Sequence, residues 1–292
     1  MYFGFSLALI IAALFPALSI SLRDDLTLTR TELEILIKFR ELVKPRLPHD
    51  YMSQDIYLLT WLRAKGFNIP AAENMLMENL KWRRANNMDN ILKENWSDFD
   101  QDFRSEFLGC DKEGSPVISI PIRDWNVRRA VMAGQSRKLM RYLDKQLEEV
   151  ATLMREARQN GQNMTQFKRI MDMTNFDFRI QACPLCIPVF ISHFLSYENH
   201  FPGSIKSVKI VNCPPIFVSL WKIVRDFLPP GMKDILMLYG KDKTEWKTAL
   251  LKEIDASQLT KEFGGQNDEG FSMGDVIKCS SLSITQAKRN LN

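Results

Sequence analysis

The chain has 292 residues, 45% of them hydrophobic, which is enough apolar side chain for a large core in one or two domains. Lys and Arg number 39 against 35 Asp and Glu, a net charge of +4, and no dense run of basic residues occurs. This composition argues against a nucleic-acid-binding surface, so we expect no nucleic-acid partner. The small positive excess suits weak attraction to an anionic membrane surface.

The first 21 residues have no charged side chain, and residues 3–18 form an almost continuous apolar run. Such a run is typical of a cleaved signal peptide, for which Ala17 and Ser19 supply small residues near a cleavage point. An uncleaved signal anchor is the alternative, because residues 3–22 are just long enough to cross a bilayer. Cleavage predicts a protein of the secretory pathway or a secreted one, and retention predicts a membrane-anchored one.

A helical module is predicted for residues 22–98. Residues 31–42 have an acidic first turn and apolar side chains near one side, as in a short amphipathic helix. Residues 55–65 end near Gly66, and residues 70–86 open on Pro70 and close with basic residues. These signals predict two further helices that form a hairpin.

A mostly parallel β-sheet with crossover helices is predicted for residues 99–265, which makes the fold class α/β. Short apolar runs at 115–121, 168–173, 207–211 and 235–240 are typical of buried strands, and the first of them is expected to begin the sheet. Longer amphipathic segments at 134–160 and 244–254 are typical of helices. Phe263-Gly264-Gly265 is expected to end the ordered unit, and residues 266–292 to form a flexible tail.

The helix predicted at residues 213–228 has an unusually wide apolar surface. It opens on Pro214 and Pro215 and is followed by Pro229. Two neighbouring apolar stripes leave only a narrow polar edge, so this helix needs a core, a cavity or a membrane to cover. A simple crossover helix packed on its sheet is the alternative.

No catalytic or cofactor motif has the context that it needs. The G-x-S-x-G pattern at 270–274 follows a polar segment instead of a strand and has no histidine downstream. Cys183 and Cys186 have C-x-x-C spacing but lie in a predicted helical region, so buried structural cysteines are expected. Zinc-ligand spacing and phosphate-binding glycine loops are absent from the sequence. We therefore expect a binding protein that is not an enzyme and has no metal or cofactor.

The five cysteines form an odd set without the spacing of a disulfide framework, which predicts mostly free thiols. Two Asn-x-Ser/Thr sequences, at Asn95 and Asn163, are acceptors for glycosylation if the chain enters the secretory pathway. Free thiols and secretion point to different compartments, so the sequence leaves the localisation open.

An ordered set of residues resembles the CRAL-TRIO family of lipid-binding proteins. In the N-terminal module the similarity lies in Leu59, Trp61-Leu62-Arg63-Ala64, Phe67, Leu80 and Trp82-Arg83. In the next domain it lies in residues 109–117, Asp172, Phe201-Pro202, Ile210-Val211-Asn212, Pro214, Phe227-Leu228 and Glu262-Phe263-Gly264-Gly265. No single motif is diagnostic, but their order and separations extend the resemblance over residues 33–265.

The resemblance implies a cup, made of the sheet and its crossover helices, that encloses one lipid under a helical lid at residues 214–228. The residues implied to line the lipid cavity are Val117, Ile118, Ile120, Met171, Met173, Phe190, Phe194, Ile210, Phe217, Trp221 and Val224. The residues implied to form the lid are Phe217, Leu220, Trp221, Val224, Phe227 and Leu228.

The resemblance further implies a monomer that binds a hydrophobic lipid and transfers it between membranes, with a membrane-resident lipid sensor or scaffold as the alternative. Most of the family is cytoplasmic and peripheral to membranes. Members that transfer phosphoinositides carry Glu and Lys at two head-group positions, where this chain has Gly203 and Ile235. The ligand is therefore open among phospholipid, tocopherol-like, retinoid, sterol and fatty lipids.

Overall fold

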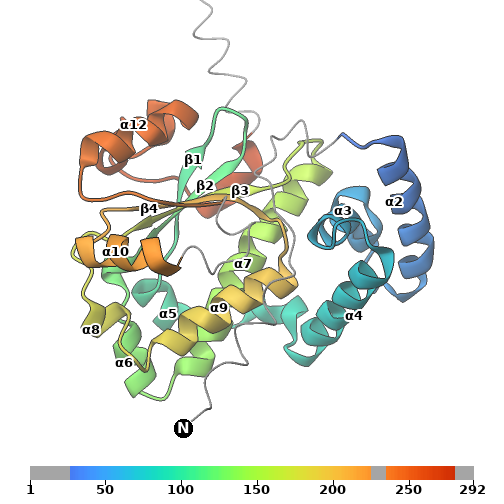
Figure 1. Cartoon of the computed structure of the whole chain (residues 1–292), viewed down its shortest axis with the longest axis horizontal. Helices are drawn as coiled ribbons and strands as arrows, with labels where there is room; N and C mark the ends of the chain where they lie inside the picture. The colour runs from blue at the N-terminus through green and yellow to red at the C-terminus, as the bar shows by residue number, and fades with distance from the viewer. Residues whose placement is uncertain (1–26, 225–234, 280–292) are drawn as a thin grey trace, which may run out of the picture.

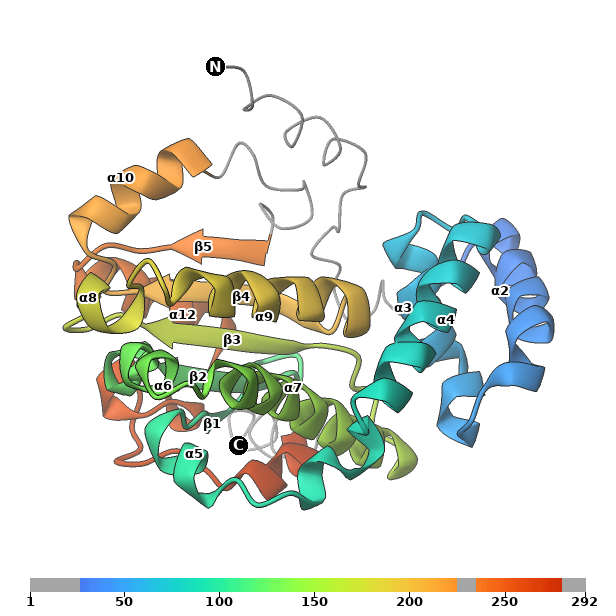
Figure 2. The same ribbon diagram turned by 90° about the horizontal axis from the view of Figure 1, so that it is seen from below.

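The computed structural model describes residues 27–224 and 235–279, and its first part is a module of three helices. These are α2 (Arg30–Val43), α3 (Asp55–Ala64) and α4 (Ile69–Ala85), which lie together at one end of the molecule (Figures 1 and 2). The α2 helix starts with a capping box, in which the side chains of Thr29 and Glu32 each accept a hydrogen bond from the other residue's backbone. The three predicted helices of the N-terminal part are confirmed.

The module has a small apolar core of its own. Leu36 and Phe39 of α2, Leu58 and Trp61 of α3 and Leu76 of α4 are fully or almost fully buried against one another. Each helix turns its apolar stripe toward the other two, as helices of a bundle do.

The second part is a five-stranded sheet whose spatial order follows the chain. Strand β1 (Glu106–Cys110) is antiparallel to β2 (Pro116–Pro121), and the remaining neighbours are parallel. The other strands are β3 (Phe167–Asp172), β4 (Ile205–Val211) and β5 (Leu236–Leu238). The sheet therefore begins one strand earlier than expected, because a tight turn at Asp111 joins β1 and β2 in a hairpin.

Helices cover both faces of the sheet (Figure 1). One face carries α12 (Lys243–Glu253), and the other carries α7 (Ser136–Gln159), α9 (Ile187–His200) and α10 (Pro215–Val224). Shorter helices are α5 (Ser97–Asp102), α6 (Val127–Met132) and α8 (Phe178–Gln181). The 3₁₀ helices are Lys44–Arg46, Asp50–Ser53, Met88–Lys93, Ile122–Asp124, Ala256–Gln258, Lys261–Phe263 and Met273–Lys278. Together the layers confirm the predicted α/β class.

The packed part of the chain continues past Gly265, so the expectation of a loose tail is wrong for residues 271–279. Phe271 forms a β-bridge with Phe107 of β1, and Val276 is fully buried. Cys279 is joined to Cys110 by a disulfide. The apolar side chains at 271, 276 and 277 pack beside β1 and α7. The polar residues 266–270 that precede them give no sign of this packing in the sequence. Residues 280–292 lie outside the described range.

The cysteines are paired, which corrects the prediction of mostly free thiols. All five lie in the described part of the chain, where Cys110 bonds to Cys279 and Cys183 to Cys186. Cys213 is the remaining free thiol and is buried. The partners Cys110 and Cys279 are 169 positions apart, and only the fold brings them together.

The predictions of a signal peptide or anchor fall on residues 1–21, outside the described residues. Among the helices of residues 27–224 and 235–279, none has both the length and the apolar character needed to span a bilayer.

Candidate functional site

The sheet face under α9 and α10 contains one apolar row and a second row in which Arg169 lies between Ile118 and Val208. Strand register aligns Ile120, Met171, Ile210 and Leu238 across four strands, and all four side chains belong to the core on this side. Side chains alternate between the two faces along each strand, so residues two apart share a face. Ile118 therefore joins the same face one row away. Of the predicted lining residues, Ile118, Ile120, Met171 and Ile210 lie together on the floor beneath these helices.

Val117 is a wrong prediction for the lipid side of the sheet. It is fully buried on the opposite face, in the core formed with Trp246 and Leu250 of α12. The apolar run of β2 predicts a strand buried on both faces, but only every second residue can face α9. The alternation places Ile118 and Ile120 there and excludes Val117.

The helices over this face contribute the aromatic residues. Phe190 of α9 and Phe217 of α10 are partly buried against the sheet-side core, and Phe194 is half-buried. Met173, buried just after β3, contacts the Cys213 thiol through sulfur at 3.8 Å. These positions lie on the predicted side of the sheet.

The lid prediction is only partly covered by the described residues. The ring of Phe217 lies 6.3 Å from that of Phe176 and 6.4 Å from that of Phe178, which attaches the first turn of α10 to α8. Trp221 is half-buried. The side chains of Leu220 and Val224, together with Phe227 and Leu228, lie outside the described part of the structure.

Several apolar side chains on these helices face solvent. Ile187, Ile191 and Leu195 follow one another at a spacing of four along α9, and each is about half exposed. Ile216 of α10 and Leu185 in the α8–α9 turn are exposed by 57% and 64%. A row of apolar residues on one helix face is a surface suited to an apolar partner.

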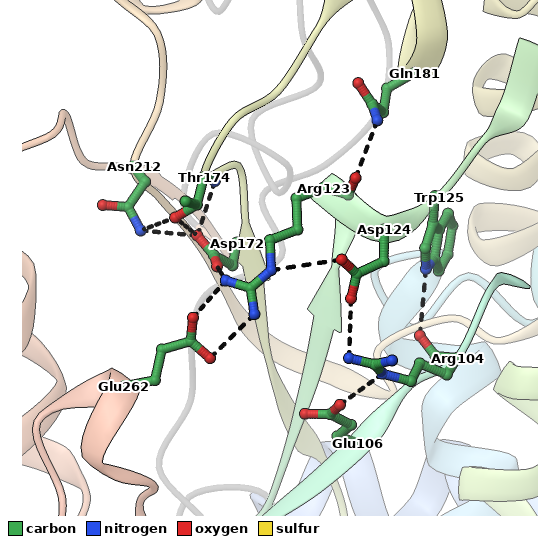
Figure 3. A network of polar contacts seen from close by, with 10 residues as sticks. All are labelled: Arg104, Glu106, Arg123, Asp124, Trp125, Asp172, Thr174, Gln181, Asn212 and Glu262. Carbon is green, nitrogen blue, oxygen red and sulfur yellow. Dashed lines mark hydrogen bonds and ion pairs between the residues drawn. The ribbon is translucent and has the colours of Figure 1, made fainter. Parts of the chain in front are cut away.

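A polar network holds the connection between β4 and α10 (Figure 3). Asp172, at the carboxyl end of β3, is buried and accepts hydrogen bonds from the backbone and hydroxyl of Thr174 and, at 2.7 Å, from Nδ2 of Asn212. Asn212 has a φ of 58°, in the left-handed region that Asn tolerates, and it turns the chain from β4 toward α10. The turn that starts α10 is thus fixed by a carboxylate on the neighbouring strand.

Arg123 extends this network to the end of the domain. Its Nη1 lies 2.7 Å from the Asp172 carboxylate, and its guanidinium also pairs with Glu262. These contacts hold the pKa of Arg123 above its ordinary value, mainly through the hydrogen bond to Glu262. Asp172, Asn212 and Glu262, far apart in the sequence, therefore meet in one cluster, as Figure 3 shows.

Arg169 and His193 are site residues that the sequence reasoning missed. Arg169 lies on the floor between Ile118 and Val208, is 6% exposed, and places Nη1 3.5 Å from Nε2 of His193 on α9. Burial lowers the pKa of Arg169 to about 10, and burial beside Arg169 lowers the pKa of His193 to about 3. The signal that could have found Arg169 is a basic residue at one position of the strand face whose other members, Phe167 and Met171, are apolar.

The other motifs of the sequence have structural roles here. Ser272 is the residue before the 3₁₀ helix Met273–Lys278, so it does not stand on a strand-to-helix elbow. Cys183 and Cys186 form a buried disulfide. Gly203 lies in the turn before β4 with a φ of 66°, and Ile235 is buried just before β5. Within the described ranges no cluster of His, Cys, Asp and Glu is arranged to hold a metal ion.

A small cavity of about 100 Å³ lies where the helical module meets the sheet domain. Its walls include Arg83, which makes two hydrogen bonds, of 2.8 and 3.1 Å, to the buried carboxylate of Glu148 on α7. The indole of Trp82 stacks on the imidazole of His200 nearby, with ring centroids 3.7 Å apart. These contacts join the module to the sheet domain.

The fold resembles known structures. The crystal structure of Sfh5 superposes with a TM-score of 0.63 at 12% sequence identity, and the match covers 90% of this chain and 99% of that one. This likeness supports the fold alone.

Curated relatives are of two kinds. The proteins named real-time of Anopheles gambiae and Aedes aegypti are 25% and 24% identical over 78% and 70% of this chain, which spans about a third of their length. A CRAL-TRIO domain-containing protein of Saccharomyces cerevisiae is 24% identical over 82% of this chain and 79% of its own. The CRAL/TRIO domain model matches residues 106–265, more than half of the chain. This protein therefore belongs to the CRAL/TRIO domain family, whose members generally bind or transfer lipids.

Proposed function

We propose that this protein binds a single hydrophobic lipid between the sheet and α9–α10 and transfers it between membranes without catalysing a reaction. The observation that carries the proposal is the apolar row on this face, which includes Ile120, Met171 and Ile210 and continues onto β5. Burial of an acyl chain contributes about 0.8 kcal/mol per methylene group, so a long chain gains on the order of 10 kcal/mol. That energy is sufficient to hold a lipid without a covalent bond.

The segment 214–228 serves in this proposal as the gate over the lipid. The turn at Asn212 and the contacts of Phe217 give it a fixed attachment at its start. Opening the gate exposes apolar side chains, and the exposed row of Ile187, Ile191 and Leu195 offers a neighbouring apolar surface. A membrane surface is the partner that contacts both the opened gate and this row. One protein molecule is sufficient to carry one lipid, so the carrier is a monomer.

The direct test is mass spectrometry of lipids extracted from protein purified without detergent. One stoichiometric hydrophobic lipid is expected. A lipid-free sample that also fails to take up fluorescent fatty acid, sterol, retinoid, tocopherol and phospholipid probes would overturn the proposal.

The gate is tested by Trp221→Asp in a vesicle-to-vesicle exchange assay. Loss of a large apolar contact, worth about 1.5–3 kcal/mol, predicts exchange roughly tenfold slower or more. Thr248→Asp adds the same charge to the exposed face of α12, across the sheet, and should leave the rate unchanged. Equal rates for the two variants would refute the gate assignment.

The alternative function is a lipid-sensing scaffold that stays on its membrane. Retention of residues 1–21 as an anchor would favour it, whereas cleavage favours the carrier. The two disulfides support an oxidising compartment, and Asn95 and Asn163 are both exposed and open to glycosylation. N-terminal sequencing of the mature protein, with glycosidase digestion, separates a secreted carrier from an anchored sensor or a cytoplasmic protein.

A further inference from the structure

Buried cations on the α12 face of the sheet are neutralised by carboxylates. Lys168 of β3 lies 2.8 Å from both Asp111 and Glu253, and Lys209 of β4 lies 2.7 Å from Glu253. Both lysines are less than 10% exposed. This is the ordinary arrangement for a charge inside a protein, because an unpaired buried charge is strongly destabilising.

Arg169 breaks this rule on the opposite face. It is as buried as the lysines, yet no carboxylate of the described residues pairs with it, and its Nε atom has no hydrogen-bond partner. Its polar neighbour is the imidazole of His193, at 3.5 Å, which is neutral above a pKa of about 3. A neutral ring accepts a hydrogen bond but does not neutralise the guanidinium.

The contact with Arg169 also determines which ring nitrogen of His193 carries the proton. A guanidinium only donates hydrogen bonds, so Nε2 of the imidazole accepts, and the proton of the neutral ring resides on Nδ1. Nδ1 is buried and has no partner among the described residues. Two N–H groups of this pair, Arg169 Nε and His193 Nδ1, therefore lack acceptors, and one positive charge lacks a counter-charge.

The position of the pair places it within the candidate lipid site. Arg169 is flanked on the floor by Ile118 and Val208, and the next row toward the carboxyl ends of the strands is apolar, with Met171 and Ile210 at its centre. A ligand with its head at Arg169 can lay its tail over that row, toward α10. A single cation surrounded by apolar residues is complementary to a ligand with an anionic head and a hydrocarbon chain.

We propose that Arg169, with His193 beside it, binds the carboxylate head of a long-chain acidic lipid inside the cup. This inference rests on the proposed lipid-carrier function and specifies its ligand class. A planar carboxylate can accept two parallel hydrogen bonds from one guanidinium. Its single negative charge neutralises the net charge of +1 on the pair of a charged arginine and a neutral histidine. A phosphate monoester would introduce a second, uncompensated charge.

The test compares two ligands that differ only in the head. Delipidated full-length protein is titrated calorimetrically with oleate and with oleyl alcohol at pH 7.5. Hydrogen bonds to a charged group predict that the wild type binds oleate about 10- to 100-fold more tightly than oleyl alcohol. In Arg169→Met that preference should fall to about one, with the affinity for oleyl alcohol retained. Arg158→Met removes a half-buried arginine of α7 and should keep the wild-type preference.

Thermal unfolding gives an independent readout. Because Arg169 is an unpaired buried charge, Arg169→Met without ligand should unfold at the wild-type temperature or above it, and oleate should no longer raise that temperature. Equal binding of oleate and oleyl alcohol by the wild type would overturn the inference but leave the carrier function standing. Tighter binding of dioleoyl phosphatidylcholine than of oleate would overturn the carboxylate assignment. Failure of all three lipids to bind would instead count against the carrier function itself.

Discussion

The bond between Cys110 and Cys279 should be a large source of stability. It joins the end of β1 to the residue after the last 3₁₀ helix, and the partners are 169 positions apart. In the chain-entropy description, closing a loop of this length removes about 5 kcal/mol of conformational freedom from the unfolded state. The bond between Cys183 and Cys186 closes a loop of three positions, for which the same relation gives about 2 kcal/mol.

Two variants separate these contributions, and each serves as the control of the other. Cys183→Ala/Cys186→Ala keeps only the long loop, and a reductant should lower its free energy of unfolding by about 5 kcal/mol. Cys110→Ala/Cys279→Ala keeps only the short loop and should lose about 2 kcal/mol under the same treatment. Comparing each variant with and without reductant removes the packing effect of the substitutions.

Urea unfolding followed by circular dichroism measures both values. Thiol titration of the unfolded, unreduced wild type should count one free thiol, that of Cys213. A count of five free thiols would refute the pairing and support the free-thiol prediction. So would an unchanged urea midpoint of Cys183→Ala/Cys186→Ala on reduction.

Two further predictions concern one buried and one partly buried carboxylate. Asp172→Asn breaks the buried pair with Arg123 and turns an amide toward hydrogen-bond donors. The free energy of unfolding should therefore fall by roughly 3 kcal/mol. A loss below about 0.5 kcal/mol in urea unfolding would contradict this. Asp144 is partly buried against α9, where its carboxylate accepts a hydrogen bond from Ser196, and desolvation raises its pKa to about 6. Because the folded state holds this proton more tightly than the unfolded state, the stability contributed by protonated Asp144 is lost as the pH rises from about 4 to 6. Asp144→Asn should therefore be up to about 3 kcal/mol more stable than the wild type at pH 7, with a flatter pH dependence between 4 and 6; equal stability at pH 7 would contradict the buried charge.

The local signals of the chain predicted most of the elements. Proline at helix starts and short apolar runs identify α4, the start of α10 and the parallel strands to within a few residues. These signals act over one or two helical turns or one strand, so a single sequence contains all the information they need. The resemblance then supplied the order in which the elements assemble.

The features that sequence reasoning missed depend on distant partners. Strand β1 contains Gly109, whose φ of 138° and close approach to Gln258 are possible only without a side chain, and a glycine weakens any strand signal. The Cys110–Cys279 pair and the packing of Val276 likewise arise from contacts between chain ends. Val117 failed for a different reason, since an apolar run does not indicate which residues face which layer.

The charged residues of strand β3 show what a short buried strand does not reveal in its sequence. Its three charged residues, Lys168, Arg169 and Asp172, have three different environments. Lys168 faces α12 and is neutralised there, and Asp172 ends the strand and fixes the turn into α10. Only Arg169 faces the apolar floor without a counter-charge, although it is one residue from a fully compensated lysine. The same fold could have placed an apolar residue at this position at no cost in buried charge, as it does at Ile118 and Val208 on either side. The ring of Phe167, 5.6 Å from the guanidinium, and the neutral imidazole of His193 supply no negative charge, so in the proposed carrier an anion beside the floor is what neutralises Arg169.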